Sequence, residues 1–263
     1  MTRAAAFFDL DKTLLAKSST LAYAKPLYES GMLTRKDVMR SAYGQFMYLV
    51  AGANETQMEQ MRAYMSDLVK GWDVETVKGV VSEALESVIS PIVYEEALKL
   101  FDEHHAAGRD VIVISSSGTE VIEPICEKLG ADRAIGTQIE IKDGKYTGEM
   151  LFYAYGEGKA EAIRDLAEDE GYDLSECYAY SDSITDLPML EEVGHPFPTN
   201  PDKELRALAA ERVWPVLDFK TPVALRTSRK KQQNVAVAGA AAAASTVALG
   251  IAWYSKIRSR GSA

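Results

Sequence analysis

The sequence predicts an α/β protein with a core of parallel strands and helices, a helical insertion in that core, and a hydrophobic helix near the C-terminal end. Short apolar runs that stop at polar residues, with helical patterns between them, predict the core. Residues 16–96 predict the insertion, because they contain no strand-like run and repeat aromatic, Met and Leu residues at helical spacing. We therefore expect a core of residues 1–15 and 97–225, a helical cap of residues 16–96, and a tail of residues 226–263.

Four segments are predicted to be strands of the parallel sheet, because apolar runs bounded by polar residues are typical of strands buried on both faces. They are residues 4–8, 111–114, 177–180 and 213–217. Helices are predicted over residues 119–129 and 158–170, each followed by a glycine that suits a C-terminal cap, Gly130 and Gly171. Asp143-Gly144 lies between two further extended stretches and predicts a tight hairpin turn.

The composition indicates a folded protein and excludes several classes. Of the 263 residues, 47% are hydrophobic and 26% are charged, which rules out a disordered, collagen-like or disulfide-scaffold chain. Residues 1–225 hold 22 of the 29 basic residues and all 39 acidic residues, a formal charge of −17. Because so acidic a body repels a phosphate backbone, we expect no nucleic-acid partner. The only two cysteines, Cys126 and Cys177, stand in no metal-ligand spacing, and we expect buried thiols.

Polar residues follow three of the predicted strands at the point where each strand ends. Asp9, Ser115 and Asp182 occupy these positions, and ligands of layered α/β proteins collect beyond the carboxyl ends of the strands. Asp9 and Asp11 are two carboxylates two residues apart, which suits a nucleophile and a proton carrier. The alternatives for such a pair are a solvated turn with a helix cap, or a simple metal site.

Four segments together resemble the motifs of one enzyme superfamily. In order, they are Asp9-Leu10-Asp11-Lys12-Thr13, the strand Val111–Ile114 with Ser115, Lys159 in Gly156-Glu157-Gly158-Lys159, and the stretch Tyr180–Leu190 that contains Ser181-Asp182 and Asp186. This set resembles the haloacid dehalogenase (HAD) superfamily, subfamily IB, in its phosphoserine-phosphatase-like branch. The resemblance implies a HAD-like Rossmannoid sheet with a helical cap inserted after the first strand.

The resemblance also implies roles for individual residues. Asp9 would form an aspartyl-phosphate, and Asp11 would act as acid and base. Ser115 and Lys159 would bind the phosphoryl oxygens, although Ser116 is an alternative to Ser115 because the register of the hydroxyl is open by one residue. The implied cofactor is Mg²⁺, and its implied ligands are Asp9, Asp11, Asp182 and Asp186. Four such carboxylates would repel one another without a cation, and Mg²⁺ takes oxygen ligands.

The implied activity is a Mg²⁺-dependent hydrolysis of a phosphate monoester, with a small phosphorylated molecule as substrate. Two other functions stay open: a phosphoryl transferase with the same intermediate, and a membrane-tethered interaction protein whose site has lost its activity. Asp11-Lys12-Thr13 also resembles the phosphorylated segment of P-type ion pumps. Those pumps need a large multi-helix membrane domain, which the sequence lacks.

The predicted cap argues against phosphoserine as the substrate. Phosphoserine phosphatases bind the amino-acid head group with an acid shortly after the first motif and a cap arginine, whereas residues 16–20 here read Ala-Lys-Ser-Ser-Thr. Arg35, Arg40 and Arg62 do not match the context of that arginine. Six of the nine methionines fall in the cap and indicate an apolar lid, so a lipid or lysophospholipid phosphate is a further hypothesis.

The tail carries a candidate membrane span. Residues 232–255 contain no charge and are flanked by basic residues, which predicts a transmembrane helix over residues 234–254 with Trp253-Tyr254 at one interface. Nine residues of 235–254 are Ala, so a soluble Ala-rich helix is the alternative. The N-terminal apolar run is too short for a signal peptide. We therefore expect a single-pass C-terminal anchor with the catalytic body in the cytoplasm.

Overall fold

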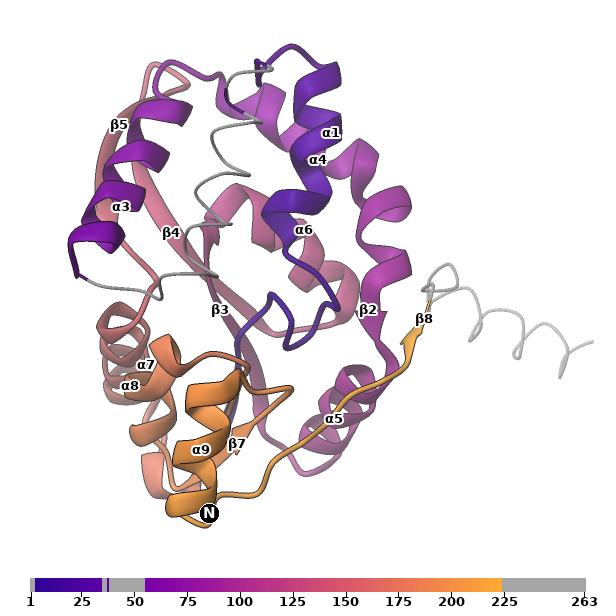
Figure 1. Cartoon of the computed structure of the whole chain (residues 1–263), viewed down its shortest axis with the longest axis vertical. Coiled ribbons are helices and arrows are strands. Elements are labelled where there is room, and N and C mark those ends of the chain that lie inside the picture. The colour runs from indigo at the N-terminus through magenta and orange to yellow at the C-terminus, as the bar shows by residue number, and fades with distance from the viewer. Residues whose placement is uncertain (1–2, 35–36, 38–54, 224–263) are drawn as a thin grey trace, which may run out of the picture. The chain divides into compact units, whose positions relative to one another are not determined.

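A computed structural model describes residues 3–34, 37 and 55–223 of the chain. Its centre is a six-stranded sheet with the order β5-β4-β3-β1-β6-β7 (Figure 1). The strands are β1 (Ala5–Phe8), β3 (Asp110–Gly118), β4 (Arg133–Lys142), β5 (Lys145–Phe152), β6 (Tyr178–Ser181) and β7 (His195–Pro198). All neighbouring pairs are parallel except β4 and β5, which are antiparallel. The predicted α/β class with a mainly parallel sheet is confirmed.

Three of the four predicted strands are present as β1, β3 and β6. Residues 213–217 were predicted wrongly, since only Leu217 pairs there, in an isolated bridge with Thr199. Val213 has a φ of 56° and is 87% exposed, so this stretch turns at the surface rather than extending in the sheet. The strand beside β6 is instead β7, His-Pro-Phe-Pro, whose two prolines are tolerated because it lies at the edge of the sheet.

Helices cover both faces of the sheet. They are α5 (Glu95–Ala106), α6 (Thr119–Leu129), α7 (Glu157–Glu170), α8 (Leu187–Glu191) and α9 (Lys203–Glu211), with short 3-10 turns η1 (Ser90–Ile92), η2 (Leu174–Glu176) and η3 (Ile184–Asp186). The predicted helices correspond to α6 and α7. Both end at the expected glycines, which have φ values of 86° and 72° and so adopt the left-handed cap.

The core consists of apolar side chains on the two faces of the central strands. On one face, Phe7 and Ile112 belong to a buried cluster with Ile163 of α7 and Met189 of α8. On the other face, the ring of Phe8 packs on Phe101 of α5, with 4.9 Å between the ring centroids. All four residues of β1 are buried, which explains why its sequence is an unbroken apolar run. Cys126 and Cys177 are both buried free thiols, as predicted.

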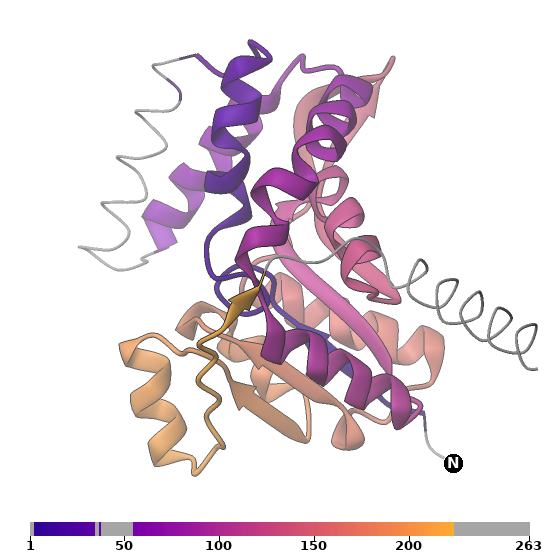
Figure 2. The same cartoon turned by 90° about the vertical axis from the view of Figure 1, so that its right-hand side faces the viewer.

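The residues between β1 and β3 are mainly helical. They include α1 (Ser19–Glu29), α3 (Glu55–Val69) and α4 (Val74–Val88), followed by η1 and the short strand β2 (Val93–Tyr94). Figures 1 and 2 show these three helices gathered at one end of the molecule, above the core strands. The predicted helical character of this segment is confirmed for the residues described, with β2 as an addition. Its treatment as a separate cap domain of residues 16–96 stays a prediction.

The β4–β5 hairpin reaches from the core sheet to the inserted helices. Its turn is the predicted Asp143-Gly144, with φ values of 51° and 76° that suit a primed two-residue turn. The amide of Val74 donates to the carbonyl of Gly144 over 2.9 Å, and the amide of Gly71 donates to that of Tyr146 over 2.8 Å. The inserted helices are therefore joined to the core by backbone hydrogen bonds as well as by the chain.

The last described residues form a strap across the molecule, residues 217–223, called here the C-terminal strap. Its end, β8 (Pro222–Val223), pairs antiparallel with β2. On its other side β2 contacts the segment after β1, where the amide of Tyr94 donates to the carbonyl of Leu14 over 2.9 Å. The helices described between residues 3 and 223 include none with the length and apolarity that a membrane span needs. The predicted span over 234–254 lies outside the described residues.

Candidate active site

The topology brings the predicted strand-end residues to one edge of the sheet. β1 lies between β3 and β6, so the carboxyl ends of the three parallel strands are neighbours (Figure 1). Asp9 follows β1 directly, Asp182 follows β6 directly, and Ser115 lies in the second half of β3. Their exposed fractions are 7%, 7% and 1%, although their side chains are polar. Buried polar groups at one edge indicate a functional site rather than a solvated turn.

Lys159 is the cation at the centre of this cluster. It lies in the first turn of α7, and its Nζ donates to Asp9 Oδ1 over 2.7 Å and to Asp186 Oδ2 over 2.6 Å. Burial alone would lower the pKa of Lys159, but the carboxylates of Asp186 and Asp9 outweigh it, so the net change raises that pKa. Lys159 is therefore a buried ammonium held between two carboxylates from distant parts of the chain.

The loop before α7 shows why the sequence needs glycine next to this lysine. A Cβ at Gly158 would lie 2.1 Å from the carbonyl oxygen of Tyr153, closer than any real contact. Gly156 has a φ of 54°, a conformation that side chains disfavour. The two glycines thus let the chain turn sharply into α7 and place Lys159 under the sheet edge.

The acidic side chains exceed the cations of the cluster. Burial raises the pKa of Asp9 to about 6, and Lys159 opposes this change only in part. Burial and the negative charge of Asp9 raise the pKa of Asp182 to about 8. The ammonium of Lys12 is 3.6 Å from Asp182 Oδ2, but its side chain is 54% exposed, so solvent screens that attraction. The buried site therefore has more carboxyl groups than cations and disfavours the ionisation of all of them at once.

Asp11 has a different environment from Asp9. Its Oδ1 accepts the backbone N–H of Ser19 over 2.7 Å, at the N-terminus of α1. Burial raises the pKa of Asp11, while hydrogen bonds from Ser19 and from the side chain of Ser18 act in the opposite direction. Asp11 thus serves as a helix cap, one of the alternatives that the sequence left open, without leaving the neighbourhood of Asp9.

The register of the β3 hydroxyls favours Ser115 over Ser116. Ser115 is buried and Ser116 is exposed, at the point where the pairing of β3 with β4 shifts its register between Ser115 and Gly118. The amide of Ser117 donates to Ser115 Oγ over 3.3 Å. The hydroxyl of Ser117 lies 3.1 Å from that of Ser19, which joins β3 to α1.

Two functional contacts were not predicted. The hydroxyl of Ser181 donates to Asp186 Oδ2 over 2.6 Å, and its position at a strand end, like that of Ser115, was the available signal. Asn200, with a φ of 49°, donates from Nδ2 to the carbonyl of Lys12 over 3.3 Å and accepts the amide of Phe219 over 2.7 Å. Nothing in the sequence shows that this side chain joins the Asp9–Thr13 loop to the C-terminal strap.

The donors present fit Mg²⁺ in their chemistry. Within the described part of the chain, no three acidic, His or Cys side chains converge closely enough to hold a metal ion by themselves. Mg²⁺ does not need three, since it is often bound by one or two carboxylates, with waters and substrate phosphate completing its shell. Asp9 and Asp182 are two buried carboxylates whose negative charges oppose each other. Ligation by Asp9, Asp11, Asp182 and Asp186 stays a prediction, and Asp11 and Asp186 already bond to Ser19 and to Lys159.

Comparison with known proteins gives a consistent family. The family model of haloacid dehalogenase-like hydrolases matches residues 6–191. A Streptomyces azureus protein named for inhibition of morphological differentiation is 54% identical, over 98% of this chain and 95% of its own length. A probable phosphatase of Mycobacterium tuberculosis is 52% identical, over 95% of this chain and 85% of its own.

More distant relatives carry more specific names. A phosphoserine phosphatase of M. tuberculosis is 34% identical, over 92% of this chain and 78% of its own length. Among solved structures, a Bordetella pertussis protein of unknown function superposes with a TM-score of 0.74 at 29% identity, over 83% of this chain and 99% of its own. The similarities therefore cover the inserted helices as well as the core.

Proposed function

Because the chain belongs to the haloacid dehalogenase-like hydrolases and is a phosphatase of their phosphoserine-phosphatase-like branch, we propose that it hydrolyses a phosphate monoester through a phosphoaspartate on Asp9. The observation that carries the proposal is the buried Lys159, bonded to Asp9 and Asp186 beside Asp182. This arrangement supplies a nucleophilic carboxylate and a fixed positive charge at one point. Both are needed to transfer a phosphoryl group.

The reaction proceeds in two steps. An Asp9 oxygen attacks phosphorus, the bond from phosphorus to the ester oxygen breaks, and Asp11 donates its proton to the leaving alcohol. Asp11 then accepts a proton from water, whose oxygen attacks the phosphorus, and phosphate leaves while Asp9 is restored. Burial raises the pKa of Asp11, which suits a group that must first hold a proton. Asp9 must be ionised to attack, and Lys159 favours its charged form.

The other residues bind and position the substrate. The Lys159 ammonium and the Ser115 hydroxyl are the proposed contacts of the phosphoryl oxygens. Mg²⁺, bound by Asp9 and Asp182, would add positive charge against the phosphoryl oxygens and lower the repulsion between phosphate and carboxylate. Asp186 holds Lys159 in place, and Ser181 holds Asp186.

The test is turnover of an aryl phosphate by the full chain with Mg²⁺. Hydrolysis of phosphate monoesters in water is so slow that the site must lower the barrier by roughly 20 kcal/mol. We expect Asp9→Asn to reduce phosphate release by at least about 10⁴-fold, because no other group can form the covalent intermediate. Asp169→Asn, on the exposed side of α7, is the matched control. Equal activity of wild type and Asp9→Asn would overturn the mechanism.

We propose further that the substrate has an apolar part, as a lipid or lysophospholipid phosphate does, and that the tail anchors the enzyme to a membrane through residues 234–254. The support is the uncharged stretch in the sequence and the absence of an acid in residues 16–20, where phosphoserine would need one. Turnover of lysophosphatidate and phosphoserine, by the full chain and by residues 1–225, tests the substrate. Recovery of the full chain in a carbonate-washed membrane fraction tests the anchor, and a full chain found only in the soluble fraction contradicts it.

A further inference from the structure

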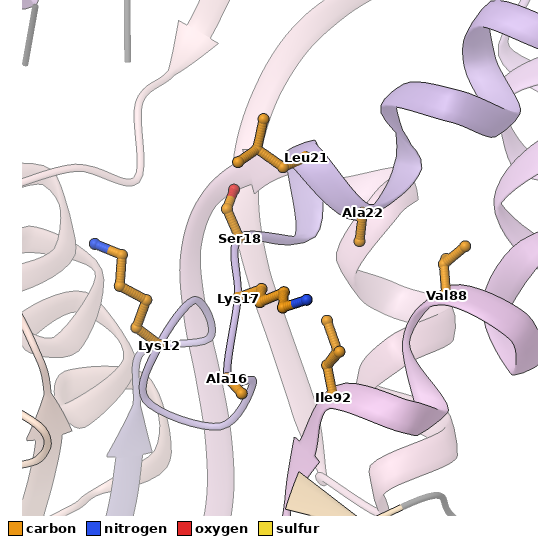
Figure 3. Close-up of a pocket in the computed structure, with 8 residues that line it drawn as sticks. All are labelled: Lys12, Ala16, Lys17, Ser18, Leu21, Ala22, Val88 and Ile92. Carbon is orange, nitrogen blue, oxygen red and sulfur yellow. The ribbon is translucent and has the colours of Figure 1, made fainter. Parts of the chain in front are cut away.

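A cavity of about 540 Å³ lies beside the candidate site, between the loop after β1 and the helices α1 and α4 (Figure 3). Its walls combine two lysines with apolar side chains. The lining residues are Lys12, Ala16, Lys17, Ser18, Leu21, Ala22, Val88 and Ile92.

The cavity adjoins the acid of the proposed reaction. Ser18, one of its lining residues, directly precedes Ser19, whose backbone N–H donates to Asp11. Lys12, another lining residue, forms the ion pair with Asp182. In the proposed function Asp11 gives its proton to the leaving alcohol, so the space next to Asp11 is where the alcohol part of the substrate lies.

The charge in this space has one sign. Among the eight lining residues, both charged ones are lysines. Lys12 has Asp182 as its partner, whereas Lys17 forms no ion pair or hydrogen bond within the described part of the chain. In Figure 3 the Lys17 side chain extends towards Val88 and Ile92, while Lys12 points to the opposite side. Lys17 thus brings an unpaired ammonium to the apolar wall of the cavity.

We infer that Lys17 selects substrates whose alcohol part carries a second anionic group, a carboxylate or a phosphodiester, on an apolar stem. The ammonium attracts that anion, and Leu21, Val88 and Ile92 offer the apolar surface on which the stem packs. A substrate with an ammonium in the same place is repelled by Lys17, and none of the eight lining residues is an acid that could bind it. This inference rests on the proposed function and adds the substrate class to it.

A series of alkyl phosphates of equal length tests this inference on the full chain with Mg²⁺. The far end of each is a carboxylate, a methyl or an ammonium group, and stems of two, four and six carbons cover the unknown spacing. We expect the carboxylate compound to have the highest kcat/KM, mainly through a lower KM. An exposed ion pair of this kind is worth roughly a 5-fold preference over the methyl compound.

Variants show whether the preference for the carboxylate compound comes from Lys17 or from the overall charge of the protein. Lys17→Gln should remove the preference for the carboxylate, and Lys17→Glu should reverse it in favour of the ammonium compound. Lys25→Gln is the control, since Lys25 is an exposed lysine of α1, the helix that follows Lys17, pairs with Glu29 at 3.6 Å and does not line the cavity. A preference that survives in Lys17→Glu would overturn the inference.

Two further arms keep the outcomes distinct. Turnover of para-nitrophenyl phosphate, which has no second charge, reports the proposed function alone, and the preference of each Lys17 variant is measured relative to it. If the wild-type chain does not hydrolyse para-nitrophenyl phosphate, the proposed function is wrong, and this outcome is distinct from a failure of selection by Lys17. Short-chain lipids with and without a phosphodiester, compared with the soluble carboxylates, show whether the anion comes from a lipid head group or from a small metabolite.

Discussion

Asp9 and Asp11 stand two residues apart, yet different parts of the molecule hold them. Asp9 is fixed by the core, through β1 and the ammonium of Lys159 from α7. Asp11 is fixed by the inserted helices, through the backbone N–H of Ser19 at the start of α1. The proposed nucleophile is therefore held by the core, and the proposed acid is held by the insertion. The position of Asp11 relative to Asp9 therefore depends on how α1 packs over the carboxyl ends of the strands.

The same contrast holds for the groups around each carboxylate. The side-chain partner of Asp9 is the buried Lys159, which comes from a distant segment of the chain. The partners of Asp11 are local, and the adjoining cavity is lined by exposed Lys17 and Leu21. On the proposed function, phosphoryl transfer belongs to the buried side around Asp9 and Lys159, and substrate selection belongs to the open side around Asp11 and Lys17. Four predictions test this division, from the largest expected effect to the smallest.

Asp11→Asn should have the largest effect of the four, because it removes the proposed acid and leaves the proposed nucleophile Asp9 in place. Without an acid, hydrolysis of an alkyl phosphate should fall by about 10²–10⁴-fold. Hydrolysis of para-nitrophenyl phosphate should lose much less in its first step, because its leaving group departs without a proton. Burst-phase kinetics with both substrates measure this difference. An equal loss in the first step for both substrates would mean that Asp11 acts through structure and not as an acid.

Lys159→Met should damage the buried side in both activity and stability. It removes the charge nearest the proposed phosphoryl position, which predicts a fall in kcat of about 10²–10³-fold. It also leaves Asp9 and Asp186 buried without their cation, which predicts a loss of about 3–5 kcal/mol in the free energy of unfolding. Urea unfolding measures this loss, with Lys99→Met, an exposed lysine paired with Glu95, as control.

A second change makes the Lys159 prediction sharper. Adding Asp186→Asn to Lys159→Met removes one of the two uncompensated charges, so part of the stability should return while the activity stays low. Recovery of activity together with stability would show that Lys159 is needed only for folding.

Gly158→Ala should disturb the placement of Lys159 without touching its charge. The added Cβ would collide with the carbonyl of Tyr153, so the loop must move, at a cost of about 1–3 kcal/mol in the free energy of unfolding. Gly79→Ala is the matched control, because Gly79 lies inside α4 with open space around it. Thermal unfolding should show the control unchanged or up to about 1 kcal/mol more stable. Equal stability of both variants would contradict the close approach at Gly158.

Ser19→Pro should have the smallest effect of the four, a shift in the pH dependence of kcat through Asp11. Ser19 is the first residue of α1, where proline is well tolerated, but proline lacks the N–H that Asp11 accepts. Loss of this hydrogen bond removes a cause that lowers the pKa of Asp11, so that pKa should rise. Because Asp11 must be protonated to act as acid, the alkaline limb of the pH profile of kcat should move to higher pH.

Ser19→Ala is the control for this prediction. It removes the hydroxyl contact with Ser117 but keeps the backbone N–H. Because the Ser19 hydroxyl is also one of the groups that lower the pKa of Asp11, the alkaline limb of Ser19→Ala should move to higher pH by less than that of Ser19→Pro. A shift of the same size in both variants would assign the effect to the hydroxyl.

The buried side was largely predictable from the sequence, and the open side was not. Asp9, Ser115, Lys159 and Asp182 stand in patterns that couple a residue type to a strand end or a helix start, and such patterns are visible in one dimension. The partner of Asp11 is a backbone N–H, which every residue but proline has, so no residue type signals it. Lys17 looks like any surface lysine until the cavity beside it is known.

The errors in the fold have physical reasons. The strand β7 escaped prediction because its two prolines argue against a strand, and only its place at the edge of the sheet permits them. Residues 213–217 attracted a wrong prediction because an apolar run does not reveal where the chain turns. Val213 turns there with a positive φ, and the run ends in the strap instead of the sheet.

The C-terminal strap sets a practical boundary for shortening the chain. β8 supplies the antiparallel neighbour of β2, and Phe219 is tied to the side chain that holds the carbonyl of Lys12. Cutting before Leu217 would release both ties and loosen the loop that carries Asp9 and Asp11, far away in sequence. A trimmed enzyme meant for kinetics or crystallisation should therefore retain every residue through Val223.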